Sequence, residues 1–148
     1  MTASKTGCED RVDRQGPIMD LGLSARGRAQ AEALRSRLAA SREISPDVFL
    51  SSTARGALET AEVIADALGQ PVIHDPDLEA WRRGGGMLDG QAFTAQWRQF
   101  TERRRPFHRH APGCETGLEF STRVLAALDR IVTQHAGKTV MLNDRHHL

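Results

Sequence analysis

The sequence predicts an α/β fold with a mostly parallel sheet, because short apolar runs alternate with amphipathic helical segments along the chain. The strongest example is Val48–Gly69, where the apolar run Val48–Leu50 is followed by small hydroxyl residues and a helical pattern that ends at Gly69. A second short strand is predicted at Pro71–His74, and a buried strand at Thr139–Leu142. Strands that alternate with helices in this way are typical of parallel sheets.

The helices are predicted from their end signals and apolar faces. Ser24 is the expected N-cap of a helix that continues to Ala40, and the hydroxyls of Ser51–Thr53 are expected to bond the first free N–H groups of the helix after the first strand. An amphipathic helix is predicted at Gln91–Arg104, and a long helix at Glu115–His135. The residues expected to form the buried side of this long helix are Leu118, Leu125, Leu128, Ile131 and Val132.

The length and composition indicate one globular domain. A chain of 148 residues is most simply one domain with a real core. Residues 1–19 are polar, carry few strand or helix signals, and are predicted to be an irregular N-terminal segment. The α/β domain is predicted to occupy residues 20–148.

The charge and the cysteine content narrow the possible partners. A net charge of +1 favours neither nucleic acid nor a membrane surface as a partner. Cys8 and Cys114 are far apart and in no paired motif, which fits a reducing compartment. The N-terminal residues lack the apolar core of a signal peptide and no apolar run has the length of a membrane span, so the expected location is cytoplasmic.

The junction after Leu50 is the first candidate binding site. Open α/β sheets bind ligands beyond the carboxyl ends of their strands, where helix N-termini attract anions. Arg55 supplies a cation on the same turn. One hypothesis is therefore a phosphate or carboxylate pocket, and the alternative is an ordinary strand–helix junction with a solvated arginine.

Four segments, in order, resemble the histidine phosphatase superfamily, the phosphoglycerate-mutase-like proteins. The first segment, DLGLSARGRAQAEAL, is similar to the family pattern D-x-x-L-[ST]-x-x-G-x-x-Q-A, and the second, SSTARGALETA, to S-S-P-x-x-R-A-x-x-T-A. The third, DLEAWRRGGGMLDG, is similar to L-x-E-…-G-…-G, and the fourth, PGCETGLEFSTRV, to P-G-G-E-S-x-x-E-F-x-x-R-V. The resemblance covers roughly Asp20–Leu142. It implies a three-layer α/β/α sandwich with a mostly parallel sheet.

The resemblance also implies a chemistry and roles for particular residues. Family members transfer phosphoryl groups through a phosphohistidine and require neither metal nor cofactor. Arginines and a second histidine surround the phosphate, and a carboxylate protonates the leaving oxygen. Glu79 matches the family acid/base, although an exposed loop glutamate is the alternative interpretation. Ser52 and Arg55 match the phosphate-binding segment, but Arg55 is one position early and Gly56 stands in the arginine's place. Glu115 matches the glutamate of G-E-S and is expected to cap the following helix.

The histidines depart from the family pattern. Counting back from Asp20, the place of the nucleophilic R-H-G motif holds roughly Ser4–Gly7, no apolar strand precedes it, and residues 1–22 contain no histidine. The second histidine is either displaced, as His146, or lost, since Leu142–Leu148 also resembles an L-N-D-x-x-H-L segment of some members. The fold is therefore expected to lack its first strand and its C-terminal elements.

Three functions remain open from the sequence. The first is an active phosphomonoester phosphatase or mutase, and the second is a non-catalytic member that binds phosphate or serves as an interaction module. The third is metal binding by loop histidines, namely His108, His110, His146 and His147. The expected partner is phosphate or a small phosphorylated molecule. A sheet without its first strand would carry exposed edges, so a marginal monomer or a homodimer is expected.

Overall fold

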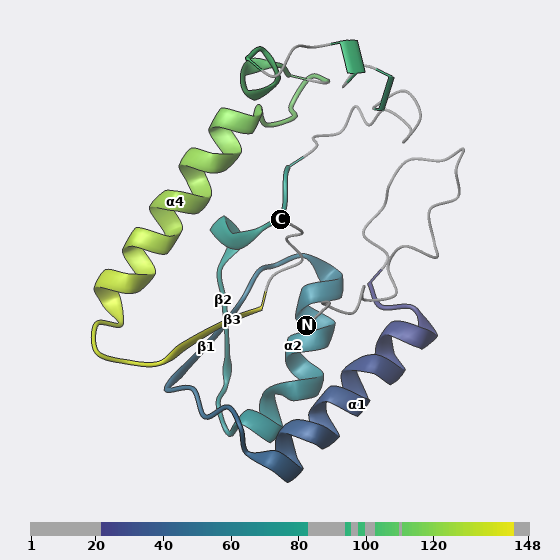
Figure 1. The fold of residues 1–148 in the computed structure, drawn as a ribbon, viewed down its shortest axis with the longest axis vertical. Coiled ribbons are helices and arrows are strands. Elements are labelled where there is room, and N and C mark those ends of the chain that lie inside the picture. Colours follow the sequence, from purple (N-terminus) through teal and green to yellow (C-terminus); the bar gives the residue numbers. More distant parts are fainter. Residues whose placement is uncertain (1–21, 83–93, 96–97, 100–102, 110, 144–148) are drawn as a thin grey trace. The chain divides into compact units, whose positions relative to one another are not determined.

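The computed structural model describes residues 22–82, 94–95, 98–99, 103–109 and 111–143. The helices and strands in chain order are α1 (Ala25–Ser41), β1 (Val48–Ser51), α2 (Arg55–Leu68), β2 (Val72–His74), the 3₁₀ helices η2 (Pro76–Leu78) and η3 (Arg105–Phe107), α4 (Gly117–Gln134) and β3 (Val140–Asn143) (Figure 1). The predicted α/β class is confirmed, and the described strands form a small parallel sheet. In the described part of the chain, no helix combines the length and apolar character that crossing a membrane requires.

The described strands form one parallel sheet in the order β2–β1–β3. Phe49 at its centre lies opposite Val72 on one side and Met141 on the other. All four residues of β1 are buried, whereas those of β2 and β3 are half-buried or exposed. The prediction of a strand at Thr139–Leu142 is confirmed, but the prediction that this strand is buried is wrong. Among the described strands β3 pairs with β1 alone, and Leu142 is 39% exposed.

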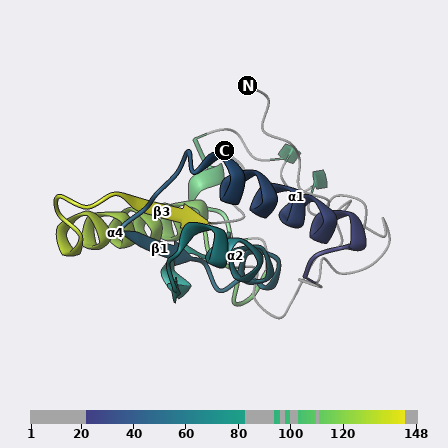
Figure 2. The same cartoon turned by 90° about the horizontal axis from the view of Figure 1, so that it is seen from below.

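The described residues belong to two compact units, one made of 22–80 and 130–143, the other of 81–82, 94–95, 98–99, 103–109 and 111–129. In the first unit, α1 and α2 pack side by side (Figures 1 and 2). Their apolar faces meet the central strand in a core composed of Leu38, Phe49, Ala61, Ile64 and Leu68. Three of these residues belong to the apolar face of α2, which is what its amphipathic pattern predicts for a helix packed on a sheet.

Helix α1 begins, and helix α2 ends, at the residues that their sequence signals predict. The Ser24 hydroxyl accepts a hydrogen bond from the Gly27 N–H at 3.0 Å, which caps α1. Gly69 ends α2 in a left-handed conformation (φ 65°) that glycine adopts without strain. The N-cap of α2 is Ala54, whose side chain makes no cap hydrogen bond, so the hydroxyl residues before it do not occupy the expected N-cap position.

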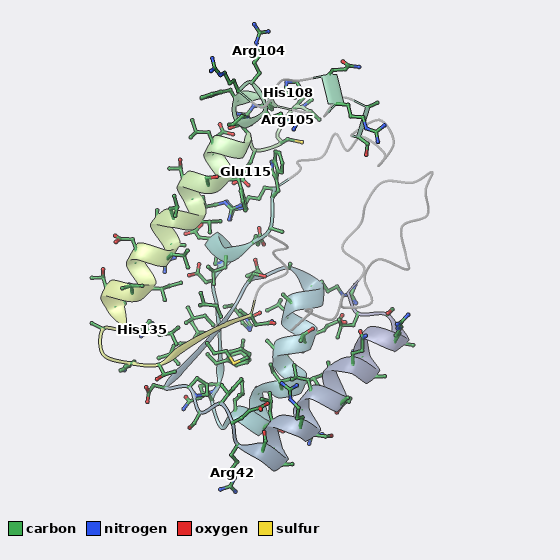
Figure 3. The ribbon with its side chains drawn as sticks, in the orientation of Figure 1. Arg42, Arg104, Arg105, His108, Glu115 and His135 are labelled. Carbon is green, nitrogen blue, oxygen red and sulfur yellow. The ribbon has the colours of Figure 1, made fainter. Side chains whose placement is uncertain are left out.

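In the second unit, a cluster of charged and aromatic residues joins the start of α4 to residues 81–82. The Glu115 carboxylate binds the Arg123 guanidinium through two contacts of 2.7 Å and accepts the Arg82 N–H at 2.9 Å. Trp81 stacks on Phe120 with ring centres 6.4 Å apart. Figure 3 labels Glu115 beside the N-terminal end of α4. Glu115 thus ties two segments together and is not the helix cap expected from the sequence.

The cap of α4 is the next residue, Thr116. Its hydroxyl accepts the Glu119 N–H at 3.1 Å, while the Glu119 carboxylate accepts the Thr116 N–H at 2.8 Å. This reciprocal pair is a capping box, which the spacing Thr116–x–x–Glu119 could have indicated. The hydrogen bond from the Thr116 N–H makes the largest contribution to the pKa of Glu119 and lowers it. Desolvation raises the pKa by less, so the pKa stays below its ordinary value.

The buried side of α4 differs from the prediction. Ile131 is buried as expected, but Leu118, Leu125 and Val132 are 49%, 65% and 70% exposed. The buried positions are Ala127 and Ile131, and Ala127 lies roughly 160° around the helix from Leu125 at 3.6 residues per turn. A seven-residue spacing of large apolar residues therefore marks the outer face of this helix.

Part of the prediction lies outside the described residues. Of the predicted helix Gln91–Arg104, residues 94–95 and 98–99 are helical, and Arg103 and Arg104 form a turn before η3. The apolar residues that predicted this helix, Phe93, Trp97 and Phe100, are not among the described residues.

Candidate functional site

The carboxyl ends of the three described strands lie level with one another. Ser51, the last residue of β1, is opposite His74 of β2 on one side and Asn143 of β3 on the other. Parallel α/β sheets bind their ligands at this edge, where strand ends and helix N-termini converge. The candidate site is therefore the group of polar residues that follow these strands in the first unit.

A hydrogen-bond network fixes the edge at Ser51. Asn143 donates from its side-chain nitrogen to the Ser51 hydroxyl at 3.1 Å and to the Ala57 carbonyl at 2.7 Å. The Ser51 hydroxyl in turn donates to the Ser52 carbonyl at 3.1 Å. Asn143 thus links β3, β1 and the first turn of α2. Sequence reasoning missed Asn143, although its position directly after an apolar run was the available signal.

Ser52, a predicted phosphate ligand, is fully buried at the start of the β1–α2 loop. Its N–H donates to the Asn143 carbonyl at 3.0 Å. Its hydroxyl has no hydrogen-bond partner among the residues that the structure describes. A buried hydroxyl without a partner costs about 1–3 kcal/mol, so Ser52 is a polar group of this edge whose hydrogen bond the described residues do not supply.

Glu79, the predicted acid/base, lies directly after η2 and is half-buried. The Thr53 hydroxyl donates a hydrogen bond to its carboxylate. This contact joins the loop after β1 to the loop after β2, two segments that the sheet already brings to one edge. Glu79 is therefore held against the same turn as Ser52, and the alternative of a freely exposed loop glutamate does not describe it.

Arg55, the second predicted phosphate ligand, is the first residue of α2. Its side chain is 67% exposed, and its Nε donates to the Glu59 carboxylate at 3.1 Å, one turn along the same helix. Gly56, which stands where the family pattern has arginine, is buried. The structure thus places Arg55 at the N-terminal end of α2 and pairs it with an acidic side chain.

Glu59 is a charged residue of this region that sequence reasoning missed. Its carboxylate accepts the Leu23 N–H at 2.7 Å and also lies 3.8 Å from the Arg28 guanidinium. The Leu23 N–H contributes most to holding the pKa of Glu59 below its ordinary value, desolvation opposes it, and Arg55 adds to the lowering. Glu59 is therefore held as a carboxylate between α1 and α2.

Several predicted residues lie outside the described part of the chain. They include His146, the candidate second histidine, and Ser4–Gly7, the place of the nucleophile motif. Of the histidines considered as metal ligands, only His108 is described, and it belongs to the second unit. The described residues contain no group of three or more histidine, cysteine or acidic side chains arranged to hold a metal.

The fold and the polar carboxyl edge define an α/β protein of the parallel class with a candidate ligand site at its strand ends. The sequence profile of the histidine phosphatase superfamily (branch 1) matches residues 8–143. The chain therefore belongs to the histidine phosphatase superfamily. Comparison with curated protein sequences gave no match.

Solved structures of similar fold support this assignment. Mycobacterial glucosyl-3-phosphoglycerate phosphatase is 22% identical with a TM-score of 0.67, and the match covers 88% of this chain and 65% of that one. The α-ribazole phosphatase of Shigella flexneri is 23% identical with a TM-score of 0.63, over 83% of this chain and 60% of that one. Bacillus stearothermophilus YhfR is 26% identical with a TM-score of 0.67, and the match covers 95% of this chain and 69% of that one. This chain thus spans only 60–69% of the length of these relatives.

Proposed function

We propose that this chain is a phosphoglycerate-mutase-like histidine phosphatase family protein with impaired or absent catalysis that still binds phosphate or a small phosphate monoester. The site proposed for binding is the carboxyl edge of the sheet, with Ser52 and Arg55 as phosphate ligands and Glu79 in the position of the acid/base. The observation that carries the proposal is the Ser52 hydroxyl, fully buried at this edge and without a partner among the described residues.

The impaired catalysis is proposed from the missing nucleophile. Phosphohistidine chemistry needs an imidazole nitrogen that attacks phosphorus, and residues 1–22 contain no histidine. The family match begins at residue 8, after the Ser4–Gly7 segment where the R-H-G motif would stand. His146 could supply a histidine only if the C-terminal residues return to the β1–α2 turn.

Retained binding is proposed from the parts of the site that remain. A phosphate needs hydrogen-bond donors and positive charge, which the Ser52 hydroxyl and the Arg55 guanidinium would supply beside the N-terminus of α2. One structural relative, the mycobacterial phosphatase, has been solved with inorganic phosphate and with VO3. Glu79 would act only on a substrate whose leaving oxygen lay next to it.

Two measurements on the whole chain test the proposal. We expect hydrolysis of p-nitrophenyl phosphate no faster than background, while inorganic phosphate shifts the NMR amide signals of Ser52 and Arg55. Arg55→Gln should weaken phosphate binding, whereas Arg35→Gln, which removes an exposed arginine from an ion pair on α1, should not. Turnover with an acid-labile phosphohistidine would refute the loss of catalysis, and the absence of phosphate binding would refute the retained site.

A non-catalytic interaction module is the second candidate function. Two observations favour it: Leu118 and Leu125 expose large apolar side chains on α4, and the outer strands β2 and β3 each have only β1 as a strand partner in the described part of the sheet. Sheet edges of this kind recruit further strands. A homodimer would cover such surfaces.

A further inference from the structure

Two hydrogen bonds and one longer ion-pair contact converge on the Glu59 carboxylate between α1 and α2. The Leu23 N–H lies 2.7 Å from it, the Arg55 Nε 3.1 Å and the Arg28 guanidinium 3.8 Å. All these residues belong to the first unit, where the two helices pack side by side (Figure 1). Two guanidinium groups and one backbone N–H make up the kind of donor set that binds a phosphate or a carboxylate.

The backbone is shaped to admit this carboxylate. Gly22 has a φ of 79°, and a Cβ atom placed on it would lie 2.3 Å from a carboxylate oxygen of Glu59. The loop before α1 therefore approaches Glu59 as closely as glycine allows. The Glu59 side chain is only 20% exposed, whereas those of Arg28 and Arg55 are 57% and 67% exposed. The Glu59 carboxylate is thus largely enclosed, whereas more than half of each arginine side chain is exposed to solvent.

We propose that Glu59 is the internal ligand of an anion site formed by Leu23, Arg28 and Arg55, and that it competes with phosphate for Arg55. This inference rests on the proposed function, because it assigns a control to the same phosphate-binding arginine. While Glu59 is charged, it holds the Arg55 guanidinium along α2. A phosphate must then break this contact and also approach a fixed negative charge.

The competition is expected to be easily reversed. An exposed ion pair between residues four apart on a helix is weak, so phosphate can displace it. Neutralising Glu59 removes both the competing contact and the repulsion between two anions. We therefore expect phosphate affinity to rise about threefold or more, given the strength of interactions between charges near a protein surface.

The test is a phosphate titration of Glu59→Gln in the full chain, followed by calorimetry. Glutamine keeps an oxygen that can accept the Leu23 N–H but carries no charge. The matched control is Glu32→Gln, which makes the same change in net charge at an exposed acid that pairs with Arg35 on α1. Inorganic phosphate should bind Glu59→Gln about threefold more tightly than wild type, and Glu32→Gln like wild type. The gain should vanish in the double variant Arg55→Gln/Glu59→Gln.

The outcomes separate this inference from the proposed function. If wild type binds phosphate and a folded Glu59→Gln binds it no more tightly, the competition is refuted and the phosphate site stands. If neither protein binds phosphate, the proposed function fails and the inference fails with it. Should Glu59→Gln not fold, NMR of the wild type decides: added phosphate must shift the Arg55 Nε signal, and binding that leaves this signal unchanged refutes the competition.

Discussion

Glu115 and Arg123 form a two-point ion pair, in which Nε and one terminal nitrogen of the guanidinium each lie 2.7 Å from a carboxylate oxygen. Both side chains are largely buried, at 14% and 11% exposure. The guanidinium also lies over the Phe120 ring, 5.5 Å from its centre. Burial opposes ionisation of Glu115, but hydrogen bonds from Arg123 and the Arg82 N–H outweigh it and hold its pKa below the ordinary value.

We predict that Glu115→Gln destabilises the protein by about 1–2 kcal/mol, since it removes charge-assisted hydrogen bonds and leaves a largely buried guanidinium without its counter-ion. Urea denaturation measures the change in the free energy of unfolding. The matched control is Glu62→Gln at an exposed position of α2, which should change stability little. Equal stability of Glu115→Gln and wild type would show that the pair contributes nothing to the fold.

The second prediction concerns acid pH. The pKa values of Glu59, Glu115 and Glu119 are all lowered from 4.5 in the folded protein. The unfolded chain therefore binds protons at a pH where these folded carboxylates do not. Their contribution to stability is complete above pH 4.5 and is lost as the pH falls through the lowered values.

The measurement is the urea midpoint between about pH 6 and pH 3. At pH values below about 4.5, we expect the urea midpoint of wild type to decrease. The urea midpoint of the variant with all three glutamates changed to glutamine should decrease less over the same pH range. The variant should start from a lower midpoint at pH 6 because its ion pairs are missing. Parallel curves for the two proteins would mean that other groups control acid unfolding.

The third prediction separates two adjacent serines. In protein without phosphate, Ser52→Ala should stabilise the fold by about 1 kcal/mol, because it removes a buried hydroxyl for which the described residues provide no partner. Ser51→Ala should destabilise it by about 1–2 kcal/mol, since the Asn143 side chain loses an acceptor. Denaturation gives both values. In a phosphate titration, Ser52→Ala should bind several-fold more weakly than wild type, and unchanged affinity would remove Ser52 from the site.

These residues show how far the sequence could predict the molecule. The apolar run at Val48–Leu50 and the helical pattern ending at Gly69 depend on neighbours in the chain, so the central strand, the following helix and their core were predictable. The contact between Leu23 and Glu59 spans 36 residues, and that between Ser51 and Asn143 spans 92. Such contacts follow from how strands pair and helices pack, which no local pattern contains.

The candidate site was predictable only in position. A helix beginning after a strand located Ser52 and Arg55, and the family resemblance located Glu79. The sequence could not indicate that Ala54 and not a hydroxyl residue is the N-cap of α2, or that Thr53 bonds Glu79 from another loop. Likewise, the outward position of Leu125 depends on which side of α4 packs, and its seven-residue spacing to Leu118 and Val132 suits either side equally.

The last prediction concerns self-association. The outer described strands present Ile73 of β2 and Leu142 of β3, which are 45% and 39% exposed. Val140–Asn143 contains none of the charges or prolines that protect sheet edges. We therefore expect a dimer, or a marginal monomer whose melting temperature rises with protein concentration over a roughly tenfold range.

Light scattering with size-exclusion chromatography measures the mass, and paired variants locate the edge. Leu142→Lys should dissociate the dimer if β3 forms the contact, and Ile73→Lys should do so if β2 forms it, because a lysine on an edge strand opposes strand addition. The lysine variant on the strand that does not form the dimer contact serves as the control for the lysine variant on the strand that does. A monomer that melts sharply at high temperature, independently of concentration, would exclude association through either edge.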